Sequence, residues 1–306
     1  MRNPWLYLKL VLTTLFWAAV FHVAKYAIAI VSPLYAGAWR FIGAAAVLLP
    51  LVALREGLPL RAMRKNAPVL LLMSAVGVLG FNLSLFYGLR QTSAVNGALI
   101  MAFNPALTVA LSGLINREPV SGRQLLGLLL SLGGVIVVIS RGSWHTLAAM
   151  SFSGGDLLVL LGSLGWATYS VLPKRFVRGL STLQVTGSTI AAGAALMAAC
   201  AAVVTPDFLQ PPPLPAAIAI AFMSLFGSVL AYLWWNEGVR VLGATSVAVF
   251  INLVPIFAAL LGLLLGQTIA WAQLAGAALV ICGVLITTGA IRFSPLASRP
   301  VPVACR

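Results

Sequence analysis

Residues 228–290 read SVLAYLWWNEGVRVLGATSVAVFINLVPIFAALLGLLLGQTIAWAQLAGAALVICGVLITTGA, three apolar runs that two short breaks separate. An earlier stretch has the same skeleton about 150 positions upstream. The recurring residues are Gly88, Arg90, Pro105, Gln124, Gly127 and Gly134 in the earlier stretch, and Gly238, Arg240, Pro255, Gln273, Gly276 and Gly283 in the later one. Further upstream, Trp17 and Lys25 recur as Trp166 and Lys174. The spacing therefore predicts one unit written twice.

The composition is that of a chain that folds in lipid. Of 306 residues, 61% are hydrophobic and 8% are charged, and the mean hydropathy is +1.05. A soluble chain carries about 25% charged residues. No soluble fold could bury this much apolar surface, so we predict an integral membrane protein.

The formal net charge of +14 does not indicate a nucleic-acid surface. The basic residues lie in short breaks between apolar runs, where they favour the inner face of a membrane and its anionic headgroups. We expect membrane lipids as partners and no nucleic acid. Cys200, Cys282 and Cys305 lack the paired spacing of a disulfide framework or a metal site, and we expect no metal and no cofactor.

Ten apolar stretches are long enough to cross a bilayer, which takes about 20 residues per helix. They are residues 6–28, 34–54, 68–88, 95–115, 123–140, 155–173, 182–204, 214–236, 244–265 and 270–290. The Pro-rich residues 293–306 follow as a tail that we expect to be disordered. The sequence thus predicts an all-α membrane fold of ten transmembrane helices.

Charge predicts the orientation of these helices. With the N-terminus in the cytoplasm, fifteen of the 19 basic residues lie at inner ends, whereas Arg90 and Arg141 lie outside. Both termini are then cytoplasmic. Because each copy has an odd number of helices, five, the second copy enters the membrane from the opposite side. Inverted repeats are typical of secondary transporters that work by alternating access, with the substrate near the midplane.

The order of these features resembles a known family. The segments LFWAAVFHVAKY (15–26) and AWRFIGAAAVLL (38–49), together with the two related stretches above, resemble the EamA-type exporters of the drug/metabolite transporter superfamily. The resemblance implies two EamA-like five-helix repeats, 1–145 and an inverted 146–292, in a bacterial inner membrane. It also implies export of small metabolites, most often amino acids. The chain departs from the family pattern at Gln267-Thr268, where the first copy has Glu118.

Polar and aromatic side chains inside the apolar runs are the candidate substrate ligands, because lipid offers them no partner. Asn82 in the first copy matches Tyr232 in the second, and Trp17 matches Trp166. The predicted substrate-binding set is Trp17, His22, Asn82, Met101, Trp166, Tyr169, Ser228, Tyr232, Trp235 and Asn252. The alternative for each is a structural role, by hydrogen bonding between helices or by aromatic packing.

Pro105 and Pro255 lie within apolar runs at equivalent positions, and each removes a backbone hydrogen bond. We predict hinges there, with a simple structural kink as the alternative. Asn104 and Asn252 either satisfy freed backbone groups or face the substrate. Arg40, about 9 Å into the second helix at 1.5 Å per residue, either binds a carboxylate or is anchored by backbone carbonyls.

The five acidic residues bear on mechanism, since all of them fall in breaks or at helix ends. Proton-coupled carriers commonly use buried carboxylates within the membrane. We therefore expect an uncoupled uniporter. The substrates that the resemblance implies are amino acids, aromatic or other neutral ones, which the protein would export, and we expect it to be a monomer. The alternative is a proton-coupled multidrug or other metabolite exporter. Neither an HExxH nor a Gly-x-Ser-x-Gly motif occurs, and we expect no enzyme activity.

Overall fold

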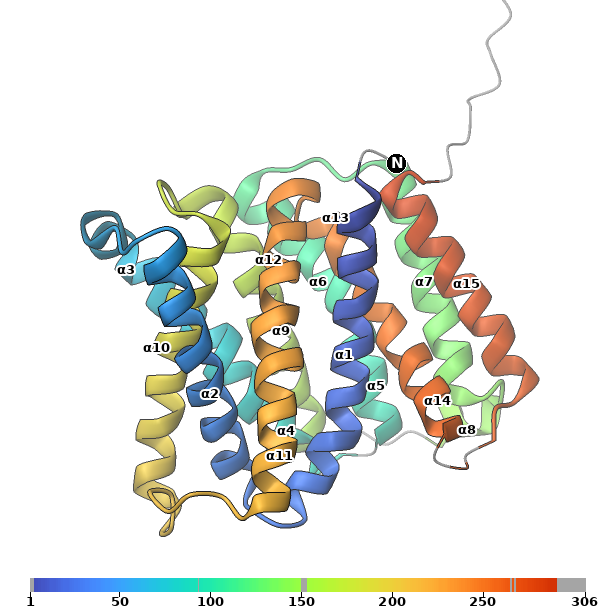
Figure 1. Ribbon diagram of the computed structural model, residues 1–306. Helices are drawn as coiled ribbons and strands as arrows, with labels where there is room; N and C mark the ends of the chain where they lie inside the picture. Colours follow the sequence, from blue (N-terminus) through green and yellow to red (C-terminus); the bar gives the residue numbers. More distant parts are fainter. Residues whose placement is uncertain (1–2, 93, 150–152, 265, 267, 291–306) are drawn as a thin grey trace, which may run out of the picture.

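The computed structural model describes residues 3–92, 94–149, 153–264, 266 and 268–290, and every regular element within these ranges is helical. Ten helical stretches are long and apolar enough to cross a membrane, which confirms the predicted all-α membrane fold (Figure 1). Two expectations concern residues outside the described ranges. They are the disorder of the tail 293–306 and the departure from the family pattern at Gln267.

The crossings alternate in direction along the chain. The first five are α1 (Pro4–Ile28), α2 (Pro33–Arg55), α3 with η1 and α4 (Leu60–Met73, Ser74–Gly80, Phe81–Leu89), α5 with α6 and η2 (Ala94–Ala102, Asn104–Leu111, Ser112–Asn116) and α7 (Gly122–Ser140). A short helix, α8 (Trp144–Ala148), follows. The last five are α9 (Gly154–Phe176), α10 (Thr182–Val204), α11 with η3 and α12 (Leu214–Phe222, Met223–Leu230, Ala231–Leu242), α13 with η4 and α14 (Ala244–Ala248, Val249–Leu253, Val254–Leu264) and α15 (Trp271–Thr288). The start of α1 and the end of α15 meet, since the Tyr7 hydroxyl donates to the Thr288 carbonyl at 3.5 Å.

Two crossings are longer than predicted. The third begins at Leu60 rather than at residue 68, and the buried Asn66 of its added turns donates to the Arg178 carbonyl at 2.9 Å. The eighth continues to Leu242 rather than to residue 236. A helix can continue past the hydrocarbon once its polar face meets water. A count of apolar residues therefore underestimates these two helices.

Equivalent polar residues start the second helix of each copy. The Ser32 hydroxyl accepts from the Tyr35 amide at 3.3 Å, and the Ser181 hydroxyl accepts from the Gln184 amide at 3.0 Å. Such side chains satisfy amides that a helix N-terminus leaves without partners. The repeat in the sequence is thus also a repeat of local structure at this point.

The helices are interrupted just before Pro105 and Pro255, the two residues predicted to be hinges. Pro105 is the second residue of α6 and follows a break at Phe103, and Pro255 is the second residue of α14 and follows the 3₁₀ segment η4. Proline suits the first turn of a helix, where its missing N–H would have no partner in any case. The interruptions lie at equivalent positions, and the hinge role of the two prolines stays a prediction.

Three π-helical segments among the described residues, η1, η2 and η3, were not predicted. Two of them, η1 and η3, occupy equivalent places in the two copies, in the middle of the third and eighth crossings. Each contains a glycine that admits a close neighbour: a Cβ on Gly77 would lie 2.4 Å from Cβ of Tyr169, and one on Gly227 would lie 2.5 Å from Val20. π-Helical turns inside α-helices are frequent at functional sites.

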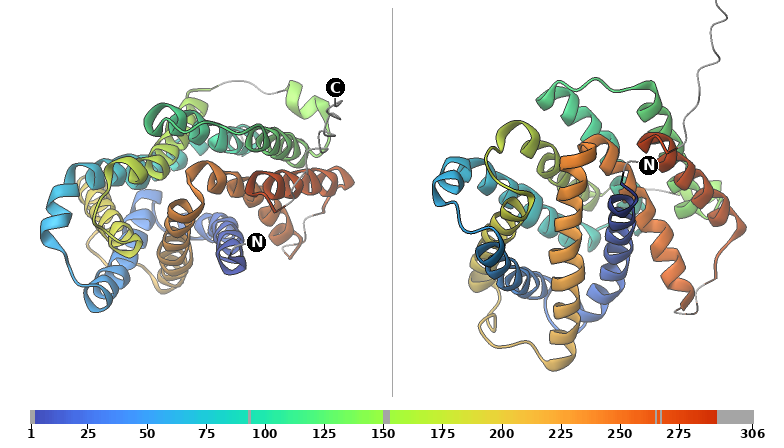
Figure 2. Two further views of the ribbon diagram at one scale, coloured as in Figure 1. Left: turned by 90° about the horizontal axis from the view of Figure 1, so that it is seen from above. Right: turned by 45° about the horizontal axis from the view of Figure 1, so that its top comes forward.

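The last helices of the two copies, α7 and α15, cross with their backbones in contact (Figure 2). A Cβ on Gly134 would lie 2.6 Å from the Gly276 carbonyl oxygen, and a Cβ on Gly283 would lie 2.5 Å from the Gly127 carbonyl oxygen. Gly127 and Gly134 are the sequence equivalents of Gly276 and Gly283. Small residues of this kind let membrane helices approach closely.

Candidate functional site

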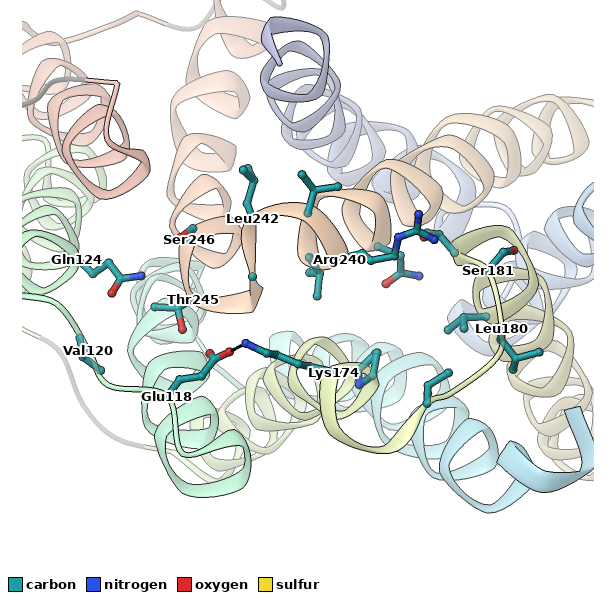
Figure 3. Close-up of a pocket in the computed structure, with 18 of the residues that line it drawn as sticks. Glu118, Val120, Gln124, Lys174, Leu180, Ser181, Arg240, Leu242, Thr245 and Ser246 are labelled. Carbon is teal, nitrogen blue, oxygen red and sulfur yellow. Dashed lines mark hydrogen bonds and ion pairs between the residues drawn. The ribbon is translucent and has the colours of Figure 1, made fainter. Parts of the chain in front are cut away.

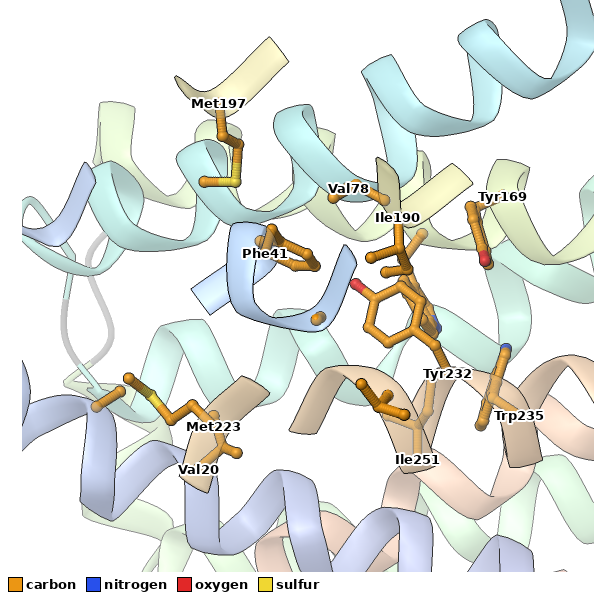
Figure 4. Close-up of a cluster of buried hydrophobic side chains, with 14 of the residues drawn as sticks. Val20, Phe41, Val78, Tyr169, Ile190, Met197, Met223, Tyr232, Trp235 and Ile251 are labelled. Carbon is orange, nitrogen blue, oxygen red and sulfur yellow. The ribbon is translucent and has the colours of Figure 1, made fainter. Parts of the chain in front are cut away.

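An aromatic cluster lies at the centre of the helices, where three crossings contribute Trp17 (α1), Trp166 and Tyr169 (α9), and Tyr232 and Trp235 (α12). Its ring centroids are 5.1 Å apart for Trp17 and Trp235, 5.2 Å for Trp166 and Tyr232, and 5.3 Å for Trp166 and Tyr169. Tyr169, Tyr232 and Trp235 can be followed in Figure 4. These separations are those of favourable edge-to-face and stacked pairs.

Equivalent residues of the two copies meet in this cluster. Trp17 and Trp166 are 5.2 Å apart at nearly a right angle. The side chain of Asn82, the equivalent of Tyr232, interacts with the Tyr232 hydroxyl. The cluster therefore lies between the two copies rather than within one of them.

The three tryptophans of the cluster differ in how their indole N–H groups are satisfied. Trp17 donates to the Gly227 carbonyl at 3.2 Å, and Trp235 donates to the Ser170 hydroxyl at 3.0 Å. The Trp166 N–H is buried and has no acceptor among the described residues. Buried donors are nearly always paired, so this N–H is available to an acceptor on a ligand.

An open cavity of about 630 Å³ lies next to the cluster, at the end of the molecule that holds the start of α1 and the end of α15 (Figure 3). It is lined by the ends of α9 and α12, the starts of α10 and α13, and the segment after η2. Asn236 is its buried polar wall and donates to the Tyr169 hydroxyl at 2.8 Å and to Thr186 at 2.9 Å. Because Asn236 directly follows Trp235, the cavity begins where the aromatic cluster ends.

Charged groups from both copies stand along this cavity. Lys174 at the end of α9 forms an ion pair with Glu118, and Arg240 of α12 lines the same cavity. Burial alone would raise the pKa of the Glu118 carboxyl, but hydrogen bonds from Lys174 and Ser112 and the charge of Lys174 outweigh it, and the pKa lies below its ordinary value. The ionised pair is therefore the form present at neutral pH.

We expect Glu118→Gln to lower stability at pH 7 and not at pH 3. A carboxyl whose pKa is lower in the folded state stabilises the fold above its unfolded pKa of about 4.3 and loses that effect as pH falls through the folded pKa. The pair is partly exposed, so the loss should be at most about 1 kcal/mol. Thermal unfolding of both proteins in detergent from pH 3 to pH 7 measures it. A difference that persists unchanged at pH 3 would contradict the assignment.

The structure brings together most, but not all, of the predicted substrate-binding residues. Seven of them lie in or beside the aromatic cluster: Trp17, Asn82, Trp166, Tyr169, Ser228, Tyr232 and Trp235. His22 lies elsewhere, with Nε2 3.3 Å from the Ala258 carbonyl oxygen. Asn252 donates to the Ser131 hydroxyl at 2.8 Å, and Met101 is half-buried in α5. None of the ten lines the 630 Å³ cavity, which begins one residue beyond Trp235.

Other polar residues of the apolar runs connect neighbouring helices. Asn104 donates to the carbonyl of Ser163 at 2.8 Å, which ties α6 to α9. The Arg40 guanidinium donates to the Gly227 carbonyl at 3.0 Å and to the Ser228 hydroxyl at 2.8 Å. Anchoring of Arg40 by a backbone carbonyl, one of the two expectations, is thus what the structure contains.

The sequence reasoning missed Asn236, although it is the polar residue that joins the cluster to the cavity. The signal was present in its spacing: Ser228, Tyr232 and Asn236 recur every four residues and share one helical face. Its place at the predicted end of the eighth crossing concealed it. The Glu118–Lys174 pair was missed because its members are far apart in sequence.

The chain matches known proteins over nearly its whole length. The model of the EamA-like transporter family matches residues 4–140 and again residues 153–289. The uncharacterized transporter YyaM of Bacillus subtilis (strain 168) is 40% identical over 293 residues, which cover 95% of this chain and 96% of that protein. The uncharacterized inner membrane transporter YedA of Escherichia coli (strain K12) is 29% identical over 291 residues, covering 90% and 89%.

A solved crystal structure has the same fold. It superposes with a TM-score of 0.78 at 22% identity and covers 94% of this chain and 98% of its own. Proteins of the matched family are transporters and not enzymes. With ten crossings, two matches to one family model and a transporter relative at 40% identity, this multi-pass membrane protein belongs to the EamA-like transporter family.

Proposed function

We propose that the protein exports neutral amino acids, aromatic ones included, across the bacterial inner membrane by alternating access. The observation that carries this proposal is a cavity open at one end that stops at a central aromatic cluster shared by both copies. A wall of aromatic rings with a few polar groups suits a zwitterion that carries an apolar side chain. The neutral hydrogen-bonding groups of Ser170, Asn236 and Trp166 supply the polar part.

The moving parts would be two inverted repeats, residues 1–145 and 146–292. Support comes from the equivalent residues that face each other: Trp17 and Trp166 in the cluster, and the glycines where α7 crosses α15. Inverted repeats exchange two related conformations when one half rocks against the other. The interruptions before Pro105 and Pro255 are the proposed bending points.

The cavity would face the cytoplasm. It opens at the end of the molecule that holds Lys174, Arg175 and Arg240, and basic residues concentrate on the cytoplasmic side of membrane proteins. Both termini would then be cytoplasmic, and the described conformation would be the one open to the inside. A cavity on this side is where an exporter loads its substrate.

Transport would not need a proton gradient. The acidic residue buried in a crossing, Asp156, lies in the first turn of α9 and accepts hydrogen bonds from Ser153, Thr92 and Asn96. It is therefore fixed at a helix end, ten residues before Trp166 on the same helix, which is about 15 Å at 1.5 Å per residue. None of the described residues of the aromatic cluster is a carboxylate that could relay protons through the centre of the membrane.

Counterflow tests the proposal directly. Purified protein is reconstituted into liposomes loaded with unlabelled amino acids, without an ion gradient, and the uptake of labelled amino acids is followed. We expect a saturable overshoot for phenylalanine, tryptophan and other neutral amino acids, and none in liposomes without protein. The absence of an overshoot for every amino acid would overturn the proposed substrate class and favour a drug or other metabolite exporter. Flux that requires a proton gradient would overturn uniport alone.

A further inference from the structure

Arg40 is a buried charge inside a membrane crossing. Its side chain is 7% exposed, and its hydrogen-bonding partners are a carbonyl and a hydroxyl, neither of which carries a charge. A buried ion is expensive unless an opposite charge compensates it, and the expense is larger within a bilayer. Arg40 is therefore expected to have an anionic partner.

The chain itself does not provide that partner. All five acidic residues are among the described residues, and each is engaged elsewhere. Glu56 binds Ser181, Glu118 binds Lys174 and Ser112, Asp156 binds Thr92, Asn96 and Ser153, Asp207 binds Gln210, and Glu237 binds Lys9. No side-chain carboxylate of the chain is thus paired with Arg40 in the described structure.

The second copy shows that the fold does not require a charge at this position. Arg40 is the equivalent of Thr189, just as Trp17 is the equivalent of Trp166. In both copies a serine of the π-helical segment donates to the backbone carbonyl at this position: Ser224 to Arg40 at 2.8 Å, and Ser74 to Thr189 at 3.0 Å. This contact between the two helices is therefore made with or without a guanidinium.

The neighbours of Arg40 are the proposed substrate-binding residues. The Gly227 carbonyl that accepts from Arg40 also accepts from the indole of Trp17, and Ser228, its other partner, is one turn before Tyr232 on α12. Ser228 and Asn236 are eight residues apart, about 12 Å at 1.5 Å per residue. The aromatic cluster thus lies between Arg40 and the open cavity.

We propose that Arg40 binds the carboxylate of the transported molecule, which makes the substrates carboxylic acids and excludes carboxyl-free amines. This inference rests on the proposed function for its location in the transport pathway. A guanidinium can hold a carboxylate through two parallel hydrogen bonds, which are stronger than those between neutral groups. Substrate from the cytoplasmic cavity reaches Arg40 when Tyr232 and Trp235 move aside. The substrate carboxylate then takes the place of the neutral partners of Arg40, the Gly227 carbonyl and the Ser228 hydroxyl, and provides the opposite charge.

Binding of 3-phenylpropionate and of its neutral amide to the protein in lipid nanodiscs tests the inference. Neither probe carries an amino group, so the result does not depend on amino-acid transport. We expect wild-type protein to bind the carboxylate at least about tenfold more tightly than the amide, because a charge-assisted hydrogen bond is stronger than one between neutral groups. Arg40→Gln, which keeps donors for Gly227 and Ser228, should abolish the preference. Arg240→Gln, which removes a cation from the open cavity, should retain it.

The possible outcomes separate this inference from the proposed function. Equal binding of the two probes by wild-type protein, or an unchanged preference in Arg40→Gln, overturns the role of Arg40 even if amino acids show counterflow. A carboxylate preference that depends on Arg40 in a protein without amino-acid counterflow supports the inference and overturns the amino-acid assignment. If Arg40→Gln does not fold, Arg40→Lys replaces it. A preference for the carboxylate that Arg40→Lys retains supports the inference. An Arg40→Lys protein that binds the amide with wild-type affinity but no longer prefers the carboxylate overturns it.

Discussion

Trp166→Phe is expected to lower transport by about 10- to 100-fold while leaving the protein close to wild-type stability. The indole N–H of Trp166 is buried without an acceptor among the described residues, at the centre of the aromatic cluster. A substrate oxygen that accepts from this N–H would gain a hydrogen bond worth about 1.5–3 kcal/mol if it is charged, and phenylalanine removes that bond. The smaller ring weakens the packing, but removal of an unsatisfied donor offsets the loss by about 1–3 kcal/mol.

The matched control is Trp235→Phe. Trp235 lies 5.6 Å from Trp166 in the same cluster, but its N–H already donates to Ser170 at 3.0 Å. We expect this variant to be less stable by about 1 kcal/mol, because the hydrogen bond that Ser170 accepts from Trp235 is lost, and to lose less transport than Trp166→Phe. Counterflow rates in liposomes and thermal unfolding in detergent measure both variants. Wild-type transport by Trp166→Phe would show that its N–H does not contact substrate.

Gly134→Ala is expected to destabilise the protein by about 3 kcal/mol, at the upper end of the usual range for overpacked sites. The added Cβ would lie 2.6 Å from the Gly276 carbonyl oxygen and 2.7 Å from the Val280 nitrogen. Both are backbone atoms of α15, which cannot move as a single side chain can. The two helices must separate along their whole crossing, and the contact between the two copies is lost with them.

The neighbouring residue Gly133 provides the control for this variant. A Cβ on Gly133 would have no neighbour within 4 Å among the described residues. Gly133→Ala should therefore be neutral or slightly stabilising, because alanine is favoured over glycine in a helix by up to about 1 kcal/mol. Unfolding of both variants by heat, monitored by size-exclusion chromatography in detergent, gives the comparison. Equal stability of the two would show that α7 and α15 are not in backbone contact.

Much of the fold could be predicted from the sequence because the relevant signals are local. A run of about 20 apolar residues is a crossing whatever its neighbours are, and all ten predicted crossings are present. The interruptions before Pro105 and Pro255 follow from a covalent property of proline. Helix ends were less accurate, as at Leu60 and Leu242, since a helix ends where its hydrogen bonds end and not where its hydropathy falls.

The candidate site was only partly predictable. Equivalence of the two copies singled out Trp17 and Trp166, which do meet. The sequence could not show that Trp17 and Trp235 find acceptors whereas Trp166 does not, because the acceptors lie on other helices. The position of the cavity beyond Trp235 was missed for the same reason.

The sequence by itself determined that the chain lies in lipid, crosses it ten times, and repeats one unit, since composition, hydropathy and period are properties of the chain alone. Only the tertiary structure decided which groups remain without a partner. Thr189 and Arg40 occupy equivalent positions in similar surroundings, yet the charge of Arg40 has no carboxylate beside it among the described residues. That difference depends on how distant helices pack, and packing in a membrane is set by contacts between helices rather than by the hydropathy of each one.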